Sequence, residues 1–140
     1  MIRFMSVNCK IFWFILSIIS CCSCVHHNKE EVKPVADCST VLPQTVFFNH
    51  DILPLFGKNC SLSGCHSGTS PAGNLNLEPS VAYSKLSKPG SGYIDTLNPE
   101  HSVLYSALVS VSNPMPPTGN LDKCDIELIR RWMLQKAKNN

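Results

Sequence analysis

The sequence predicts an all-α fold built from short helices and long loops. No segment alternates apolar and polar residues in the strict way that a half-buried strand requires. Apolar residues recur at helical spacing only in short stretches, which begin or end at Pro, Asp or Asn. Gly, Pro and Ser concentrate in two segments, 67–79 and 110–120, which are long loops for so small a domain. We therefore expect short helices, with the loops wrapped around another group.

Three short helices are expected in the middle of the chain. The first follows Asp51 as its N-cap and has Pro54 in its first turn, where a missing N–H costs little. A second fits residues 79–86. A third fits residues 99–109, with Asn98 as its N-cap and proline as its first helical residue.

The last helix has the clearest sequence signals. Asp122 is a suitable N-cap, and Asp125 follows it at the spacing of a capping box. Leu121 precedes the cap and faces Ile126, as in a hydrophobic staple. A broad apolar face then predicts that the helix is buried on one side, through Ile126, Leu128, Ile129, Trp132 and Met133.

The N-terminus has the features of an export signal. Arg3 and Lys10 precede an apolar run over residues 11–19, which is too short to span a bilayer as a helix. The run ends in Ile-Ile-Ser-Cys, which resembles a bacterial lipobox and implies cleavage before Cys21 and lipidation of that residue. The alternatives are an ordinary secretory signal cut nearby, such as before His26, or an uncleaved anchor.

These features divide the chain into three parts. Residues 1–20 are a lipoprotein-type signal peptide, residues 21–45 a flexible polar tether, and residues 46–140 the folded domain. We therefore expect an exported lipoprotein that is anchored in a membrane and faces the periplasm or the cell surface. The formal net charge of +2 falls to zero without the two basic residues of the leader. This balance gives no indication of nucleic-acid binding, which requires a surplus of basic residues.

The motif Cys60-Ser-Leu-Ser-Gly-Cys65-His66 is the strongest indication of chemistry. Covalent haem requires two thiols to add across two vinyl groups and an adjacent imidazole to reach the iron, usually as C-x-x-C-H. Here the spacing is C-x4-C-H, so the two extra residues must bulge outward. Two alternatives remain open from these residues alone: a small disulfide loop between Cys60 and Cys65, or part of a zinc site.

A proline-rich loop around Met115 favours haem. Three prolines in Asn-Pro-Met-Pro-Pro-Thr-Gly fix the backbone around one thioether, which suits a neutral ligand to haem iron. Met133 fits the core of the last helix better, and His50 and His101 are expected at the surface. The alternative is a proline-rich turn with an incidental methionine.

In order and spacing, these segments resemble the planctomycete-type cytochrome c domain, which is also common in Bacteroidetes. The resemblance covers nearly all of the folded part and rests on a helix that ends at Cys60, Gly64-Cys65-His66, the Gly-Asn-Leu-Asn-Leu stretch at 73–77, the Pro-Glu-His-Ser-Val-Leu-Tyr stretch at 99–105, Met115-Pro116-Pro117 and a final helix with Trp132. It implies a cytochrome c-like fold with one haem c per chain, thioether bonds at Cys60 and Cys65, and His66 and Met115 as axial ligands.

The resemblance also implies a function and a further pairing. A haem with two axial ligands has no open position for a substrate, so we expect a monomeric electron carrier rather than an enzyme, with a redox protein as its partner. Cys38 and Cys124 can come within disulfide range if the first and last helices pack together, or they are unrelated thiols. Water would be excluded from the haem by Leu75, Leu77, Leu104, Leu108 and Trp132. Two other functions stay open: a haem-based sensor or peroxidase-like protein with an open sixth site, and a haem-free, disulfide-stapled structural lipoprotein.

Overall fold

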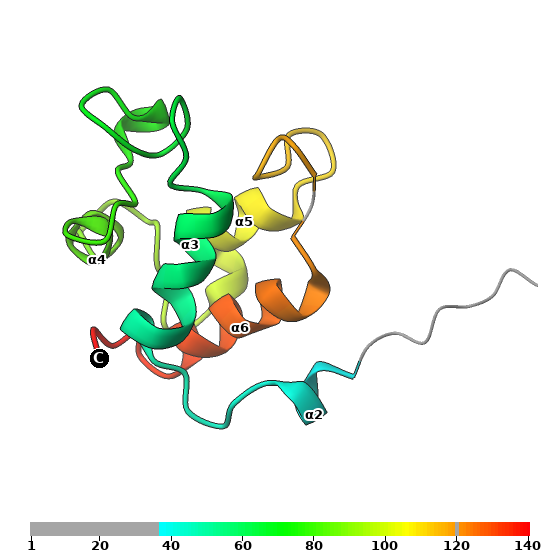
Figure 1. Ribbon diagram of the computed structural model, residues 1–140. Coiled ribbons are helices and arrows are strands. Elements are labelled where there is room, and N and C mark those ends of the chain that lie inside the picture. Colours follow the sequence, from blue (N-terminus) through cyan, green and yellow to red (C-terminus); the bar gives the residue numbers. More distant parts are fainter. Residues whose placement is uncertain (1–36, 120) are drawn as a thin grey trace, which may run out of the picture. The chain divides into compact units, whose positions relative to one another are not determined.

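The computed structural model describes residues 37–119 and 121–140 (Figure 1). The predicted signal peptide, the lipidation site at Cys21 and most of the predicted tether lie outside these residues. The described part contains helices and no strand, which confirms the all-α class. Among the described helices, none combines the length and hydrophobicity that crossing a bilayer would require. The elements are α2 (Cys38–Val41), η2 (Phe48–Ile52), α3 (Leu53–Asn59), η3 (Ala72–Asn74), α4 (Ala82–Leu86), η4 (Pro99–His101), α5 (Val103–Val109) and α6 (Lys123–Leu134).

The apolar face of α6 forms the centre of the core, as its sequence pattern predicts. Ile129, Trp132 and Met133 are fully buried. The Trp132 ring lies 5.2 Å from the ring of Phe48, measured between centroids, and its Nε1–H donates to the carbonyl of Lys138 at 2.9 Å. Asp122 caps this helix by accepting from the Cys124 N–H at 2.8 Å, as predicted. Helix α6 packs against η2, α5 and α2, so it connects the other elements.

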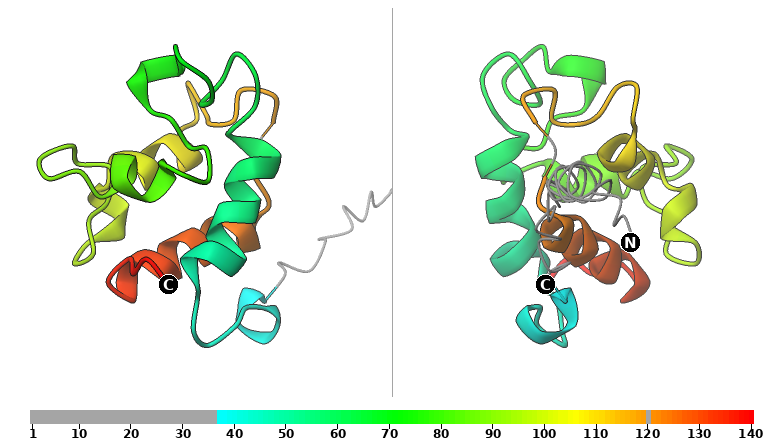
Figure 2. Two further views of the ribbon diagram at one scale, coloured as in Figure 1. Left: turned by 60° about the vertical axis from the view of Figure 1, so that its left-hand side comes forward. Right: turned by 90° about the vertical axis from the view of Figure 1, so that its right-hand side faces the viewer.

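The loops gather at one end of the molecule. Figures 1 and 2 show α3, α5 and α6 in the middle, with the loop after α3 and the loop after α5 together at the top. Helix α2 and the C-terminal residue lie at the opposite end. There the Asn49 N–H donates to the carbonyl oxygen of Asn140 at 2.9 Å, and the Phe48 N–H donates to its side chain at 3.0 Å.

The segment 38–45, which the sequence assigns to the tether, packs against the folded domain. Helix α2 is linked to the first turn of α6 by a disulfide between Cys38 and Cys124, whose Cα atoms are 5.2 Å apart. Arg131 donates to the Pro43 carbonyl at 2.9 Å, and Gln135 donates to the Gln44 carbonyl at 2.7 Å. Residues 38–45 therefore pack on α6, although their polar sequence shows no periodic pattern that would indicate it.

The first predicted helix starts before its expected cap. A π-helical turn, η2, precedes α3 and contains Asp51. The Asp51 carboxylate accepts from the Phe47 N–H at 2.7 Å, so it caps this earlier turn instead of α3. Tertiary packing supports the extension, because Phe48 and Ile52 in this turn are buried in the core. Pro54 lies in the first turn of α3, as predicted.

The predicted helix over 99–109 is divided at Ser102. Residues Pro99–His101 form a 3₁₀ turn, and α5 begins only at Val103. Asn98 makes no capping hydrogen bond through its side chain. Instead, the fully buried Ser102 hydroxyl accepts from the Tyr105 N–H at 3.1 Å and donates to the Pro99 carbonyl at 2.6 Å.

This arrangement gives a prediction that separates the two candidate caps. Ser102→Ala should lower the free energy of unfolding by about 1–2 kcal/mol, because it removes a cap and one of the two hydrogen bonds to the buried Pro99 carbonyl. Asn98→Ala should change the free energy of unfolding by about 0.5 kcal/mol or less, because Asn98 is exposed and its side chain makes no capping hydrogen bond. Chemical denaturation of both variants measures the difference, and equal losses would contradict the assignment of Ser102 as the cap.

Candidate functional site

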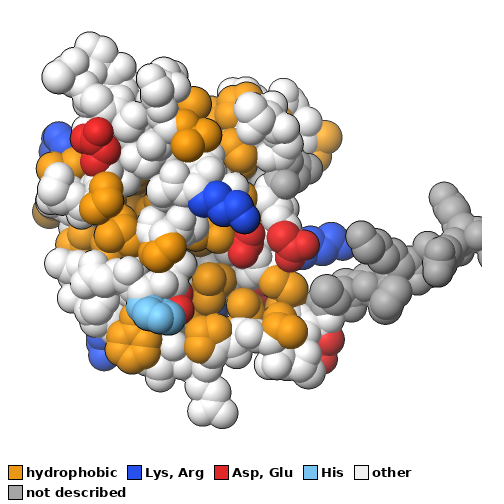
Figure 3. Space-filling view, viewed as in Figure 1, with side chains coloured by type: hydrophobic (Ala, Val, Ile, Leu, Met, Phe, Trp, Pro, Cys, Tyr) orange, Lys and Arg blue, Asp and Glu red, His pale blue; other side chains and the backbone are white. Residues whose placement is uncertain are grey.

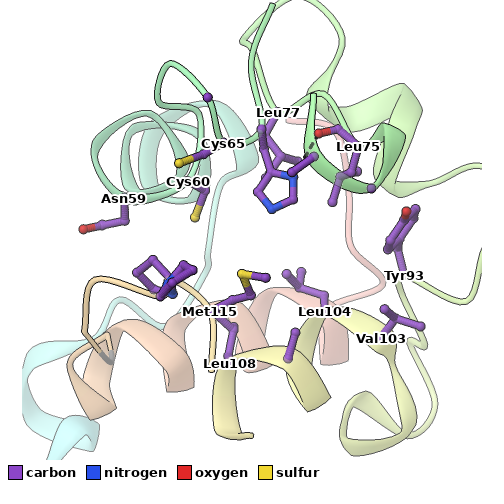
Figure 4. A pocket seen from close by; sticks show the side chains of 17 residues that line it. Asn59, Cys60, Cys65, Leu75, Leu77, Tyr93, Val103, Leu104, Leu108 and Met115 are labelled. Carbon is purple, nitrogen blue, oxygen red and sulfur yellow. Dashed lines mark hydrogen bonds between the residues drawn. The ribbon is translucent and has the colours of Figure 1, made fainter. Parts of the chain in front are cut away.

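A cavity of about 320 Å³ lies between the loop that follows α3 and the face of α5. This volume falls within the range of small-molecule and cofactor sites. Its lining is mainly apolar and brings the predicted haem residues together (Figure 4). The lining residues are Asn59, Cys60, Gly64, Cys65, His66, Ala72, Gly73, Leu75, Leu77, Tyr93, Val103, Leu104, Ala107, Leu108, Met115, Pro116 and Pro117.

A compact loop positions the two thiols and the imidazole. Cys60 is the C-cap of α3, and its carbonyl accepts from the His66 N–H at 3.1 Å. The Cys65 N–H donates to the Leu62 carbonyl at 2.9 Å, which closes the turn between the cysteines. Gly64 has φ +78, a conformation that a residue with a Cβ rarely adopts. The two extra residues of the C-x4-C-H spacing are thus accommodated in a local turn, and both thiols line the same cavity.

The imidazole of His66 is oriented by a hydrogen bond to the backbone. Its Nδ1 lies 3.1 Å from the carbonyl oxygen of Leu75, the contact drawn as a dashed line in Figure 4. Because a carbonyl only accepts, Nδ1 must carry the proton in this contact, and Nε2 keeps its lone pair. Metal-binding histidines typically have this arrangement, with the non-ligating nitrogen donating to a carbonyl or carboxylate. His66 is therefore prepared to coordinate a metal through Nε2.

Two residues that the sequence did not single out hold the loop that carries Leu75. The Asn76 side chain donates to the Glu78 carboxylate at 3.0 Å and to the Gly68 carbonyl at 3.1 Å. Glu78 also accepts from the Gly68 N–H at 3.1 Å, and these hydrogen bonds hold the pKa of its carboxyl below the usual value. The signal in the sequence is local: asparagine two residues before glutamate favours an Asx turn, seen here as the Glu78 N–H donating to Asn76 at 2.8 Å.

Met115 lines the cavity from the opposite side. Its N–H donates to the carbonyl of Ala107 in α5 at 2.9 Å, which attaches the proline-rich loop to that helix. The Met115–Pro116 peptide bond is cis, and Pro116 and Pro117 also line the cavity. Figure 4 shows Met115 across the cavity from Cys60, Cys65 and Leu75. A neutral thioether and a neutral imidazole therefore face one apolar space.

The other candidate ligands lie elsewhere. The side chain of His50 is 86% exposed, and His101 is exposed at the end of η4. Met133 is buried in the core, as its position on α6 predicts. Of the five residues expected to shield the site from water, four line the cavity, namely Leu75, Leu77, Leu104 and Leu108. The fifth, Trp132, does not line it and packs on Phe48 instead, so that expectation was wrong.

The chemistry of the site disfavours the two haem-free interpretations of the motif. Cys60 and Cys65 are free thiols and form no disulfide loop. Among the described residues, no three His, Cys, Asp or Glu side chains cluster as metal ligands, and Cys38 and Cys124 are bonded to each other. Burial, with a smaller contribution from Cys65, raises the pKa of Cys60 to about 11. A protonated thiol is a poor nucleophile.

The fold and the site together define a class of protein: a small α-helical domain whose loops enclose an apolar cavity with two thiols, an imidazole and a thioether. No protein-family model, no curated protein and no solved structure matches this chain.

Proposed function

We propose that this protein is a c-type cytochrome of the kind its sequence resembles, with a cytochrome c-like fold and one covalently bound haem, and that it transfers single electrons. The observation that carries the proposal is the convergence of Cys60, Cys65, His66 and Met115 on one apolar cavity. A bound haem supplies an iron centre that alternates between two oxidation states. The donor set fits this group, because two thiols can form thioethers while the imidazole and the thioether ligate the iron.

The two axial positions decide between a carrier and an enzyme. If haem binds, His66 Nε2 and the Met115 thioether are the residues that would hold its iron. No position would then be left for a substrate, a gas or a peroxide, so the proposed activity is electron transfer without catalysis. The Leu75 carbonyl fixes the imidazole, and the bond from Met115 to α5 fixes the thioether loop.

The apolar lining of the cavity limits how much the surrounding groups must reorient when an electron arrives or leaves. Leu75, Leu77, Leu104 and Leu108 are at most 8% exposed, and all four line the cavity. Water would have to reorient each time an electron arrives or leaves, whereas packed aliphatic side chains do not. This environment supports a carrier that exchanges electrons with small structural change.

The proposal places the protein outside the cytoplasm, anchored as a monomeric lipoprotein in a membrane that faces the periplasm or the cell surface. It rests on the lipobox-like Ile-Ile-Ser before Cys21 and on the requirement of covalent haem for maturation after export. Cys21→Ala should move the protein from the membrane fraction to the soluble fraction. Cys22→Ala is the matched control, because it removes the neighbouring thiol, which is not directly preceded by the lipobox-like Ile-Ile-Ser.

The spectrum and mass of the mature protein test the proposal directly. The full chain should be produced in a bacterium that has haem-attachment machinery, and then denatured and extracted with acidic organic solvent. We expect the denatured protein to keep one haem and to give a haemochrome spectrum. A polypeptide that loses all haem on denaturation would contradict the proposal and favour a haem-free lipoprotein.

Met115→Ala tests the sixth ligand. Axial ligands move haem reduction potentials over a range of about 0.8 V, and thioether ligation raises the potential. The variant should therefore have a reduction potential lower by roughly 0.1 V or more, or should bind carbon monoxide in the reduced state. Potentiometric titration and the reduced spectrum measure these changes. Met133→Leu is the matched control in the core, and a Met115 variant that behaves like it would identify a different ligand.

A further inference from the structure

The two chain segments that enclose the cavity carry no charged side chain. Residues 60–77 and 102–119 contain no Asp, Glu, Lys or Arg. Both segments contribute to the cavity wall. Charged residues occur immediately outside them, at Lys58, Glu78 and Glu100. The absence of charge therefore covers the full length of both segments that line the cavity, although charged residues border them.

Burial does not explain this absence. Four apolar side chains in these segments are strongly exposed: Leu62 is 43% exposed, Val103 49%, Val109 47% and Val111 100%. Exposed positions are those where Lys, Glu and Asp are most often found, so a continuous uncharged surface is unusual. We call the exposed residues of 60–77 and 102–119 the uncharged collar. In Figure 3 hydrophobic and other uncharged atoms cover the uppermost edge of the view, while an acidic and a basic side chain lie below it on the left.

Two of the charges that border the collar have partners within the protein. Glu100 accepts from Arg130 Nε at 2.7 Å, and Glu78 accepts from Asn76 at 3.0 Å. Arg130 partly neutralises Glu100, whereas Glu78 keeps its charge, so charge lies at the border of the collar and not within it. A charged partner surface would lose hydration against the collar and would find no opposite charge in return.

We infer that the uncharged collar is the docking surface for a redox partner protein whose own facing surface is uncharged and apolar. The cores of transient interfaces are depleted of charged residues, and small apolar side chains such as Val111 and Leu62 suit such a core. Association is then driven by apolar contact at short range and not by electrostatic steering. This inference rests on the proposed function, because it is the haem cavity that the collar surrounds.

Electron self-exchange between two copies of the mature protein tests the inference with a defined partner. Each copy presents its uncharged collar to the other, so the exchange rate should depend little on salt. Between ionic strengths of about 0.01 M and 1 M the Debye length falls from about 30 Å to about 3 Å. We expect the rate, measured by NMR line broadening in mixtures of oxidised and reduced protein, to change by less than about twofold. A change of about tenfold or more would overturn the inference.

A charge placed in the collar should make the exchange sensitive to salt. Val111→Lys puts like charges face to face, so exchange should slow several-fold at low salt and recover at high salt. In a mixture of Val111→Lys and Val111→Glu the facing charges are opposite. The effect of salt should then be reversed, and electron exchange between the two variants should be faster at low salt. Val41→Lys is the matched control, because Val41 is 69% exposed on α2, outside the collar. If Val111→Lys behaved like Val41→Lys, the collar would not be the exchange surface.

The two levels of the proposal fail in different ways. A chain without covalent haem shows no haemochrome spectrum, which overturns the proposed function and this inference with it. A chain with the expected spectrum but a strongly salt-dependent self-exchange rate overturns only the docking surface.

Discussion

Replacing both Cys60 and Cys65 with serine is expected to abolish covalent haem attachment entirely. Both thiols line the cavity and both are free, so each is available to form a thioether bond. Serine has nearly the same shape but does not form this bond. The double variant should therefore give no haem band in denaturing gels and a mass that corresponds to the polypeptide alone.

The single variants show whether the C-x4-C-H spacing supports two bonds. If both thioethers form in the parent protein, Cys60→Ser and Cys65→Ser should each keep one bond and shift the haemochrome band. If only one thiol reacts, one of the two variants should be indistinguishable from the parent and the other should lose the haem. Cys38→Ser/Cys124→Ser is the matched double variant, because it removes two thiols that lie outside the cavity and should keep the covalent haem.

Loss of the haem should also loosen the fold. Several side chains of the hydrophobic core, including Leu75 and Leu104, line the cavity of about 320 Å³. A domain of this size has little other apolar surface to bury. The Cys60→Ser/Cys65→Ser variant should therefore lose its near-ultraviolet circular dichroism, while part of the far-ultraviolet helical signal remains.

The second large effect is expected at the disulfide. Cys38→Ser/Cys124→Ser opens a loop whose ends are 86 residues apart in sequence, and it should lower the free energy of unfolding by about 4–5 kcal/mol in the chain-entropy model. Chemical denaturation of the haem-loaded protein, with and without reductant, measures this loss. Reductant should destabilise the parent protein and leave the double variant unchanged. A loss below about 1 kcal/mol would contradict a stabilising role for the bond.

Local signals predicted much of the fold because they act over a few residues. The cap at Asp122 and the apolar face with Ile129 and Trp132 depend on positions within one helix, and the structure has both. Leu104 and Leu108, which were expected to shield the site from water, are buried on α5.

Other features depend on contacts between distant segments, and the sequence alone did not indicate them. Asp51 caps a π-helical turn that exists because Phe48 reaches the core. Ser102 caps α5 in place of Asn98, because its buried hydroxyl accepts from the Tyr105 N–H and donates to the Pro99 carbonyl. The lipidation site at Cys21 stays a prediction, because it lies outside the described residues.

The candidate site was also predictable only in part. The pattern of Cys60, Cys65, His66 and Met115 predicted which residues are involved, and these residues line one cavity. The fixed orientation of the imidazole was not predictable, because it depends on the Leu75 carbonyl and on the hydrogen bonds of Asn76 and Glu78. Every residue has a backbone carbonyl, so the sequence does not show which carbonyl accepts a given hydrogen bond. This role is seen only in the structure.

The link between α2 and α6 has a mechanical consequence. A pulling force applied to the chain at Asp37 passes through the Cys38–Cys124 bond directly into α6. The covalent path bypasses the segment between the two cysteines, which includes both loops that enclose the cavity. Tension at this end of the domain is therefore carried by α6, at the centre of the core, and the cavity loops remain unloaded.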